Sequence, residues 1–495
     1  MLEDVALGVD IGTTGCKVTA LNSNGDVLGS VMVPYEVRTP HPGWAEQDPN
    51  DWFNAFIQAI RKILRDLSIQ PRSVKALGID GMMNSPVFID EELKPIRPCI
   101  LWLDQRSYEQ ISIISKLFKE HGITSPLPIT PVVALAKILW VISREPRTWE
   151  KTYKVILPKD YVRLKLTGSL ATDPSDASAT LLFDGEKYSW AHYLKEIFMV
   201  DLDKLPEIKQ SSEVVGFITK EVSSLLGLPE GIPVVTGCSD GAADALAAGL
   251  VNKYDTLIRL GTSGALFMVY DKYVPDVKQS YFILAHAIQN AWLIHQMFPF
   301  GIPHKWFFET FYRHEVEQAK MKNVDPYAYI EELIDVKEPD GLFFIPNAGY
   351  EEDPSYFYGA FIGIKHSHTR SHFALALLIG LAFSLREALE PIIEKFKPNV
   401  GAVKLIGGGS RSPLLQEIMA ITLKSTIAVP EHHAASIGAG ILAAVGTRMF
   451  ASYREAIDKV IKIKRQVIPK IEEYERYDEM YRVYKYFKHK FFKHN

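Results

Sequence analysis

The chain has 495 residues, and its 55 Lys and Arg against 59 Asp and Glu give a formal charge of −4, almost neutral for this size. Hydrophobic residues make up 47% and charged residues 23%, ordinary globular values that exclude disorder for most of the chain. Because single hydrophobic cores stop growing near about 250–300 residues, two or more domains are expected. The lack of excess basic charge argues against nucleic acid as the main partner.

The cysteines and the N-terminus indicate a cellular compartment. Cys16, Cys99 and Cys238 are the only cysteines. An odd number with no close pair fits neither a disulfide framework nor a zinc ribbon, so we expect reduced cytosol. The first residues lack the basic region and cleavage site of a signal peptide. No apolar run approaches the ~18–20 residues of a membrane span. A cytoplasmic protein without membrane attachment is predicted.

The first 35 residues predict an antiparallel meander of three strands. Short apolar runs at 5–9, 17–21 and 27–33 are typical of strands. The second and third runs are separated by Asn24-Gly25, the strongest short hairpin signal. The first turn, 12–15, is rich in Gly and Thr.

Strands and helices alternate after the meander, which points to an α/β architecture. Asp48-Pro49 is a good helix start, and a strand follows at 74–79. A helix of small residues is expected at 436–446. The aromatic and basic end, 481–495, is expected to form an amphipathic helix that packs on its own domain, rather than to bind RNA or a membrane.

Three glycine-rich turns follow apolar strands. The Gly-Thr-x-Gly pattern of the first turn recurs at 261–264, about half a chain later, which suggests two similar halves. The third turn, 407–410, follows the strand predicted at 403–406. Glycine lets the backbone approach a ligand closely, and successive N–H groups form an anion-binding nest. These turns therefore suit phosphate binding, although the P-loop and Rossmann motifs are absent from them.

Two aspartates are candidates for chemistry. Asp10 ends the first strand beside a phosphate nest, where a carboxylate can hold Mg²⁺ through water or simply stabilise a turn. Asp240 follows the apolar run 232–235 and begins a helix of small residues. It either caps that helix or accepts the proton of a substrate hydroxyl during phosphoryl transfer.

Several segments together resemble the FGGY carbohydrate kinases, a branch of the actin/hexokinase/Hsp70 ATPase superfamily. They occur in the family's order, at 8–14, 44–49, 100–106, 157–161, 237–241, 260–264 and 405–410. The resemblance implies an α/β fold of two actin-like, ribonuclease H-like domains flanking a catalytic cleft. Residues 1–245 would form the N-terminal domain, with the sugar site, the first phosphate hairpin and the catalytic Asp. Residues 246–495 would form the nucleotide-binding C-terminal domain.

The resemblance also implies roles for individual residues, with ATP and Mg²⁺ as cofactors. Asp240 matches the catalytic base, and Asp10 and Asp240 are assigned to the metal. The residues assigned to the nucleotide are Thr13, Thr14, Lys17, Gly261, Thr262, Gly301, Gly408 and Gly409. Those assigned to the sugar are Met83, Asn84, Trp102 and Asp240.

The substrate signals are mixed. Met83-Asn84 stands where glycerol kinases carry Arg-Glu and where xylulokinases and many gluconokinases carry Met-His, so glycerol is disfavoured. Gly241 and the stretch 125–131 look like gluconokinases, whereas the tracts 157–160 and 173–178 look closer to xylulokinases. The family's Gly-Glu-Arg-x-Pro stretch is altered at 349–354, which removes an Arg.

The favoured prediction is an ATP-dependent sugar kinase that converts D-xylulose to xylulose 5-phosphate. Kinases of gluconate or of another pentulose or polyol remain as alternatives within the family. A non-catalytic sugar-binding regulator and an actin-like ATPase are the alternatives from other classes. The expected partners are a small sugar and ATP, and the sequence leaves open whether the protein forms a homodimer.

Overall fold

The computed structural model describes residues 3–346 and 359–491. The altered stretch 349–354 and the last four residues of the predicted terminal helix therefore lie outside the described residues. The chain divides into two compact units that interleave in sequence. Unit 1 comprises Met1–Lys253, Val269–Ile294 and His432–Lys462, and unit 2 comprises Tyr254–Met268, His295–Glu431 and Ile463–Asn495. The domain division near residue 245 stays a prediction.

The sheet of unit 1 contains the predicted meander, and the α/β class is confirmed. Its order is β13-β14-β5-β1-β2-β3, and β15 also pairs with β5. Strands β1, β2 and β3 pair antiparallel through tight turns, and β1 pairs parallel with β5. The bounds are β1 Val5–Ile11, β2 Gly15–Asn22, β3 Val27–Pro34, β5 Val74–Gly81, β13 Val214–Phe217, β14 Pro233–Val235 and β15 Cys238–Ser239.

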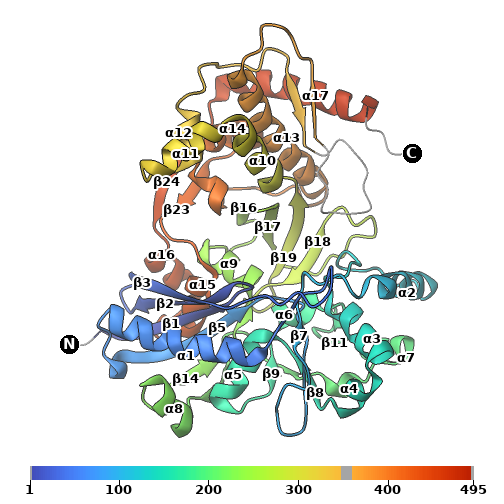
Figure 1. The fold of residues 1–495 in the computed structure, drawn as a ribbon, viewed down its shortest axis with the longest axis vertical. Coiled ribbons are helices and arrows are strands. Elements are labelled where there is room, and N and C mark those ends of the chain that lie inside the picture. The colour runs from blue at the N-terminus through green and yellow to red at the C-terminus, as the bar shows by residue number, and fades with distance from the viewer. Residues whose placement is uncertain (1–2, 347–358, 492–495) are drawn as a thin grey trace. The chain divides into compact units, whose positions relative to one another are not determined.

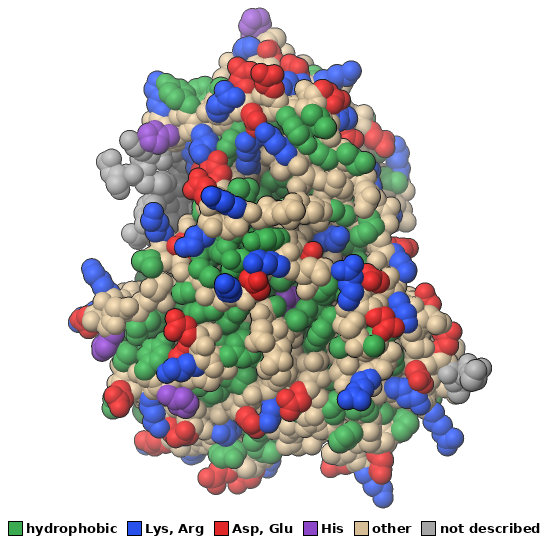
Figure 2. All heavy atoms as spheres, turned by 180° about the vertical axis from the view of Figure 1, so that it is seen from behind, with side chains coloured by type: hydrophobic (Ala, Val, Ile, Leu, Met, Phe, Trp, Pro, Cys, Tyr) green, Lys and Arg blue, Asp and Glu red, His purple; other side chains and the backbone are tan. Residues whose placement is uncertain are grey.

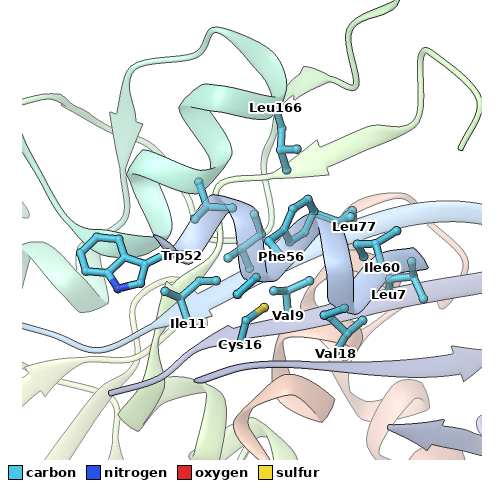
Figure 3. Close-up of a cluster of buried hydrophobic side chains, with 14 of the residues drawn as sticks. Leu7, Val9, Ile11, Cys16, Val18, Trp52, Phe56, Ile60, Leu77 and Leu166 are labelled. Atoms are coloured by element: carbon cyan, nitrogen blue, oxygen red, sulfur yellow. The ribbon is translucent and has the colours of Figure 1, made fainter. Parts of the chain in front are cut away.

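Helix α1 (Pro49–Asp66) packs its apolar side on this sheet. As predicted, Asp48 caps the helix, and its side chain accepts from the backbone N–H of Asn50. Trp52, Phe56 and Ile60 are fully buried. Figure 3 shows them beside Leu7, Val9 and Ile11 of β1 and Leu77 of β5 in one hydrophobic cluster. Burying large apolar side chains contributes about 1.5–3 kcal/mol each, and this stabilises β1 and β5, which carry Asp10 and Asp80 one residue before their ends.

Helix α15 (Ala435–Gly446) is the predicted helix of small residues, and it belongs to unit 1. It packs directly on the strands: a Cβ on Gly8 would lie 1.8 Å from the Ser436 carbonyl oxygen, and one on Gly78 would lie 2.2 Å from that of Ala439. The Thr19 and Ser436 hydroxyl oxygens are 2.7 Å apart. Small side chains at these positions therefore allow helix and sheet backbones to touch.

The second sheet repeats the arrangement of the first. Its order is β18-β19-β17-β16-β22-β23-β24. Strand β16 pairs antiparallel with β17 through the second Gly-Thr-x-Gly turn and parallel with β22, as β1 does with β2 and β5. This supports two similar halves. The bounds are β16 Thr256–Leu260, β17 Gly264–Tyr270, β18 Phe282–Ala285, β19 Trp292–Phe298, β22 Val403–Ile406, β23 Ile427–Pro430 and β24 Ile463–Val467.

Helix α13 (Arg370–Phe396) is the one helix among the described residues that is long and apolar enough to cross a membrane, but 67% of its most apolar window is buried inside the protein. It is a core helix of unit 2. The terminal helix α17 (Tyr474–Phe491) lies along α13 (Figure 1). The rings of Tyr481 and Tyr484 contact Phe383 of α13. The Lys488 ammonium lies 2.7 Å from Glu387 of α13. Packing of the basic terminal helix on its own domain is thus confirmed.

The remaining elements connect these layers. In unit 1 the helices are α2 Tyr108–Glu120, α3 Ala134–Arg144, α4 Pro146–Lys151, α5 Pro158–Thr167, α6 Pro174–Ala179, α7 Leu194–Phe198, α8 Lys220–Leu226, α9 Asp240–Ala247 and α16 Tyr453–Val460. In unit 2 they are α10 Gly301–Phe311, α11 Arg313–Met321, α12 Pro326–Glu331 and α14 Pro413–Leu423. Short strand pairs are β4 Glu46–Gln47 with β7 Cys99–Ile100, β6 Val87–Ile89 with β8 Lys154–Ile156, β9 Ala171–Thr172 with β12 Glu207–Ile208, β10 Phe183–Asp184 with β11 Ser189–Trp190, and β20 Phe343–Ile345 with β21 Ala360–Ile362.

The surface carries charges of both signs. On the face shown in Figure 2, Lys and Arg side chains alternate with Asp and Glu over the described residues. This mixed pattern agrees with the formal charge of −4. Attraction of an anionic ligand must therefore come from local groups rather than from a broad basic field.

Candidate functional site

The first glycine-threonine turn joins β1 to β2 and is held from three sides. Its own hairpin closes through a bond from Gly12 N to Gly15 O of 3.2 Å. The Tyr35 hydroxyl donates to Gly12 O at 2.5 Å, and the Gln47 amide donates to Thr13 O at 2.8 Å. The Thr13 side chain is half-buried and Thr14 is exposed. The turn is therefore fixed in shape while a threonine hydroxyl and backbone remain accessible, as phosphate binding requires.

A cluster of carboxyl groups lies at the ends of the central strands of unit 1. Asp10 of β1 and Asp80 of β5 are direct neighbours in the parallel ladder, and Lys17 of β2 stands opposite Asp10 in the antiparallel one. Burial, and then the charges of Asp240 and Asp244, raise the pKa of Asp10 to about 7. Burial and neighbouring negative charges disfavour the ionised form of Asp10, and a cation bound beside it would stabilise that form.

Asp80 is a functional candidate that was missed from the sequence. Its side chain is fully buried, and neither carboxyl oxygen accepts from an N–H group in the described part of the chain. Its carboxyl faces that of Asp10, and burial followed by the charge of Asp10 raises the pKa of Asp80 well above its usual range. The available signal was the same as for Asp10, an aspartate directly after a buried strand.

Asp240 opens helix α9 from a sharp turn. Gly237 has a φ of +88°, and a Cβ there would lie 2.0 Å from the Ile79 carbonyl oxygen, so this turn requires glycine. The N-cap is Ser239, whose hydroxyl oxygen accepts from Ala242 N at 3.3 Å. Asp240 is therefore the first residue of the helix and not its N-cap. Its Oδ1 accepts from Gly241 N at 2.8 Å, and Asp244 lies one helical turn later.

The four residues assigned to the sugar all lie in unit 1, and three of them besides Asp240 are close to the start of α3 or to the first phosphate turn. Asn84 is 7% exposed, has a φ of +61°, and its Oδ1 accepts from Ala134 N at the start of α3 at 3.0 Å. Met83 is half-buried against the apolar cluster that includes α3. Trp102 is 39% exposed, and its indole N–H donates to the Thr13 hydroxyl at 3.0 Å. That hydrogen bond connects the residues assigned to the sugar with the first phosphate turn.

A pocket of about 580 Å³ in unit 2 contains every residue assigned to the nucleotide in this unit. Gly261, Thr262, Gly301, Gly408 and Gly409 line it. The sequence did not reveal the aromatic part of its wall, because that part depends on helix packing. These further lining residues are Phe300, His304, Trp306 and Tyr327.

The pocket wall is built by close backbone contacts. A Cβ on Gly301 would lie 2.1 Å from Gly261 O and 2.8 Å from Thr262 Cα, so the start of α10 presses on the second phosphate turn. The Ile302 N–H donates to Thr262 O at 3.0 Å. Burial lowers the pKa of His304 to about 4, so the His304 ring is uncharged at neutral pH. The pocket thus pairs the N-terminus of α10 with flat, neutral rings, which suit an anionic group and a base respectively.

The assigned residues fall into two groups. Asp10, Thr13, Thr14, Lys17, Met83, Asn84, Trp102 and Asp240 belong to unit 1, whereas Gly261, Thr262, Gly301, Gly408 and Gly409 belong to unit 2. Across residues 3–346 and 359–491, no group of three or more His, Cys, Asp or Glu side chains is arranged to hold a metal ion by itself. Mg²⁺, however, takes only one or two protein carboxylates together with waters and substrate phosphates. Asp10 and Asp240, whose charges already repel each other, fit that donor set.

Comparison with known proteins agrees with this geometry. The model of the N-terminal domain of the FGGY family of carbohydrate kinases matches residues 5–247, and that of the C-terminal domain matches residues 256–447. A xylulose kinase from Staphylococcus epidermidis is 30% identical over 494 residues, covering 98% of this chain and 96% of that protein. A gluconokinase from Bacillus licheniformis is 29% identical, covering 96% and 93%.

A solved structure shares the fold. The crystal structure of a xyloylose kinase from Brucella ovis has a TM-score of 0.85 at 27% identity, covering 97% of this chain and 98% of that one. Both family models, the relatives and the fold therefore agree along nearly the whole length. The chain belongs to the FGGY family of carbohydrate kinases and is a phosphotransferase that acts on a sugar hydroxyl.

Proposed function

We propose that the enzyme transfers the γ-phosphoryl group of ATP to D-xylulose, giving xylulose 5-phosphate. The observation that supports the chemical part is the Asp240 turn, where Ser239 and not Asp240 is the N-cap of α9 and where the Asp240 carboxylate lies close enough to Asp10 to raise its pKa. Asp240 then accepts the proton of the sugar hydroxyl. The hydroxyl oxygen forms a bond to phosphorus as the bond from phosphorus to the ADP oxygen breaks.

The two glycine-threonine turns have complementary tasks in this proposal. The pocket of unit 2 binds the nucleotide, with the aromatic wall on the base and Gly261 and Thr262 on the phosphates. Thr13, Thr14 and Lys17 of unit 1 hold the transferred group, which carries negative charge throughout the reaction. Mg²⁺, when bound by Asp10 and Asp240, supplies charge neutralisation on the phosphates.

The choice of D-xylulose as substrate rests on the names of similar proteins and on the chemistry of the residues assigned to the sugar. The Staphylococcus epidermidis relative bears the name xylulose kinase, which supports a ketopentose. The gluconokinase relative at nearly the same identity makes gluconate the second candidate. Asn84 offers an uncharged amide rather than a cation, which favours a neutral sugar over a sugar acid.

The test is a substrate panel. ADP formation is measured with ATP and Mg²⁺ in the presence of D-xylulose, D-ribulose, gluconate or glycerol, each against a blank without sugar. The proposal predicts the highest kcat/KM for D-xylulose and a blank rate at least about 100-fold lower. A higher kcat/KM for gluconate than for D-xylulose contradicts the proposed substrate but leaves the sugar kinase in place. The cytoplasmic location stays a prediction, and a homodimer stays a possibility that the sequence leaves open.

A further inference from the structure

Directly behind the Asp240 turn, unit 1 contains a buried cluster of charges that the proposed mechanism does not use. Lys159, in the first turn of α5, has no exposed surface. Its ammonium lies 2.6 Å from Asp160 and 3.1 Å from both Asp173 and Asp176. Arg163, one helical turn later, lies 3.0 Å from Asp160. Because burying such ions costs several kcal/mol each, the arrangement calls for an explanation.

The cluster is connected to the residue before the base by a chain of hydrogen bonds. The Asp173 carboxylate accepts from the Ser175 hydroxyl at 2.6 Å and from the Ser175 backbone N–H at 3.0 Å. The same hydroxyl oxygen accepts from Ser239 N at 2.8 Å. Ser239 is the N-cap of α9 and directly precedes Asp240. A continuous path therefore runs from Lys159 through Asp173 and Ser175 to Ser239, the residue directly before the proposed base.

The other end of the turn is also held by this cluster. The Arg163 guanidinium donates to the Thr236 carbonyl oxygen at 2.5 Å. The stem of Lys159 lies beneath the turn, since a Cβ on Gly237 would be 3.4 Å from its Cδ. Cations thus fix residue 236, and Ser175 fixes residue 239. The carboxylate at 240 takes its position from a segment clamped at both ends.

The electrostatics keep this clamp intact. Burial alone would lower the pKa of Lys159, but Asp160, Asp176 and Asp173 together raise it above its ordinary value, so the ammonium stays charged. The hydrogen bonds and ion pairs of this cluster are linked to one another, and a linked buried network specifies a geometry more strongly than separate contacts do, although the Asp176 oxygens and Arg163 Nε make no hydrogen bond within the described residues. Groups that react must be held within about 0.5 Å of their productive position, and supporting shells of this kind provide that accuracy.

We propose that Ser175, supported by Lys159 and Asp173, is a positioning residue that sets the place of the catalytic carboxylate through Ser239. The inference rests on the proposed role of Asp240 as the base. Ser175 touches neither sugar nor nucleotide in this account. Its effect is on kcat, because the clamp governs the attack step and not the pocket that binds ATP.

The experiment compares Ser175→Ala with Ser211→Ala. The Ser211 hydroxyl donates to the same Asp173 carboxylate, at 2.8 Å. Both variants remove one hydroxyl donor from that carboxylate, but only Ser175→Ala also breaks the bond to Ser239 N. We expect Ser175→Ala to lower kcat by about 10- to 100-fold. We expect Ser211→Ala to stay within about threefold, and the KM for ATP to change by less than about twofold in both variants.

A second readout is independent of activity. Amide hydrogen exchange of the peptide spanning 236–244 should be about tenfold faster in Ser175→Ala and unchanged in Ser211→Ala. Equal kcat values for the two variants, together with equal exchange, would overturn the proposal. If Ser175→Ala does not fold, Ser175→Cys gives the same comparison, because a thiol is a weaker acceptor for the Ser239 N–H. An unchanged kcat and exchange rate in that variant also count against it.

Asp240→Asn separates this proposal from the proposed function. Full activity of Asp240→Asn refutes the role of Asp240 as the base, and with it the effect of Ser175 on catalysis. A difference in hydrogen exchange between the two serine variants would still show that Ser175 holds the segment 236–244 in place. An inactive Asp240→Asn, combined with indistinguishable serine variants, leaves the base in place and refutes only the positioning role.

Discussion

Gly301 offers a sharp test of the proposed nucleotide pocket, because a single methyl group there meets backbone on several sides. In Gly301→Ala the new Cβ would lie 2.1 Å from Gly261 O and 2.7 Å from Thr262 O. Real Cβ atoms essentially never approach closer than 3.0 Å. Backbone cannot rotate away as a side chain does, so the second phosphate turn or the start of α10 must move by about 1 Å.

The expected cost follows from that displacement. Overpacking of this kind destabilises a fold by about 1–3 kcal/mol. A shift of about 1 Å in groups that hold a reacting phosphate can reduce the rate by about 100-fold. We therefore expect Gly301→Ala to lower kcat/KM for ATP by about 10- to 100-fold. The KM for the sugar should stay within about threefold, since the residues proposed to bind the sugar lie in unit 1.

Steady-state kinetics with varied ATP at saturating sugar measure this effect, and thermal unfolding with and without ADP measures the loss of binding separately. Gly401→Ala is the matched control, because a Cβ at Gly401 meets nothing within 4 Å in the same unit. It should change the free energy of unfolding by no more than about 0.5 kcal/mol. If Gly301→Ala binds ADP and turns over ATP as well as Gly401→Ala does, the assignment of this pocket to the nucleotide is wrong.

Three further predictions concern the buried groups of unit 1. Asp80→Asn should raise the free energy of unfolding by about 1–3 kcal/mol at pH 8, because a carboxyl whose pKa is raised in the folded state destabilises the fold as pH rises above its unfolded pKa of about 4. Thermal unfolding should show this gain in stability shrinking towards pH 4, and an equal gain at both pH values contradicts the raised pKa as its cause. Because Asp10 has a pKa of about 7 and Mg²⁺ requires its ionised form, the Mg²⁺ concentration for half-maximal rate should rise about fivefold from pH 7 to pH 6, and a flat profile refutes this role. Cys16 and Cys238 are fully buried, and burial raises the pKa of both thiols. A bulky thiol reagent should therefore label them only as fast as the protein unfolds, and rapid labelling of the native protein would contradict this packing.

Local features were predictable because their causes lie within a few residues. The Asn24-Gly25 hairpin formed where expected, with Gly25 at a φ of +94°. The helix start at Asp48 and both Gly-Thr-x-Gly turns were also found at their predicted places. In each case turn chemistry or a side-chain cap within a few residues favours the observed backbone, and distant contacts such as Tyr35 to Gly12 O stabilise it further.

Features that depend on long-range pairing could not be predicted. Asp80 meets Asp10 only because β1 and β5 pair in parallel, which joins residues 70 positions apart. Helix α15 returns to unit 1 from the far end of the sequence because Gly8 and Gly78 let it approach the sheet, a fit that composition alone does not disclose. The segments around Lys159 and Ser175 were used only as family signals, since nothing local shows that they meet behind the Asp240 turn.

The central claim is that Asp240 acts as the base of sugar phosphorylation. Single-turnover measurement with Asp240→Asn at saturating D-xylulose and ATP tests it most directly, with ATP binding measured in parallel by calorimetry. The account predicts that xylulose 5-phosphate forms at least about 1,000-fold more slowly while the Kd for ATP changes by less than about threefold. Formation of the product at a rate within about tenfold of the unsubstituted enzyme would contradict it.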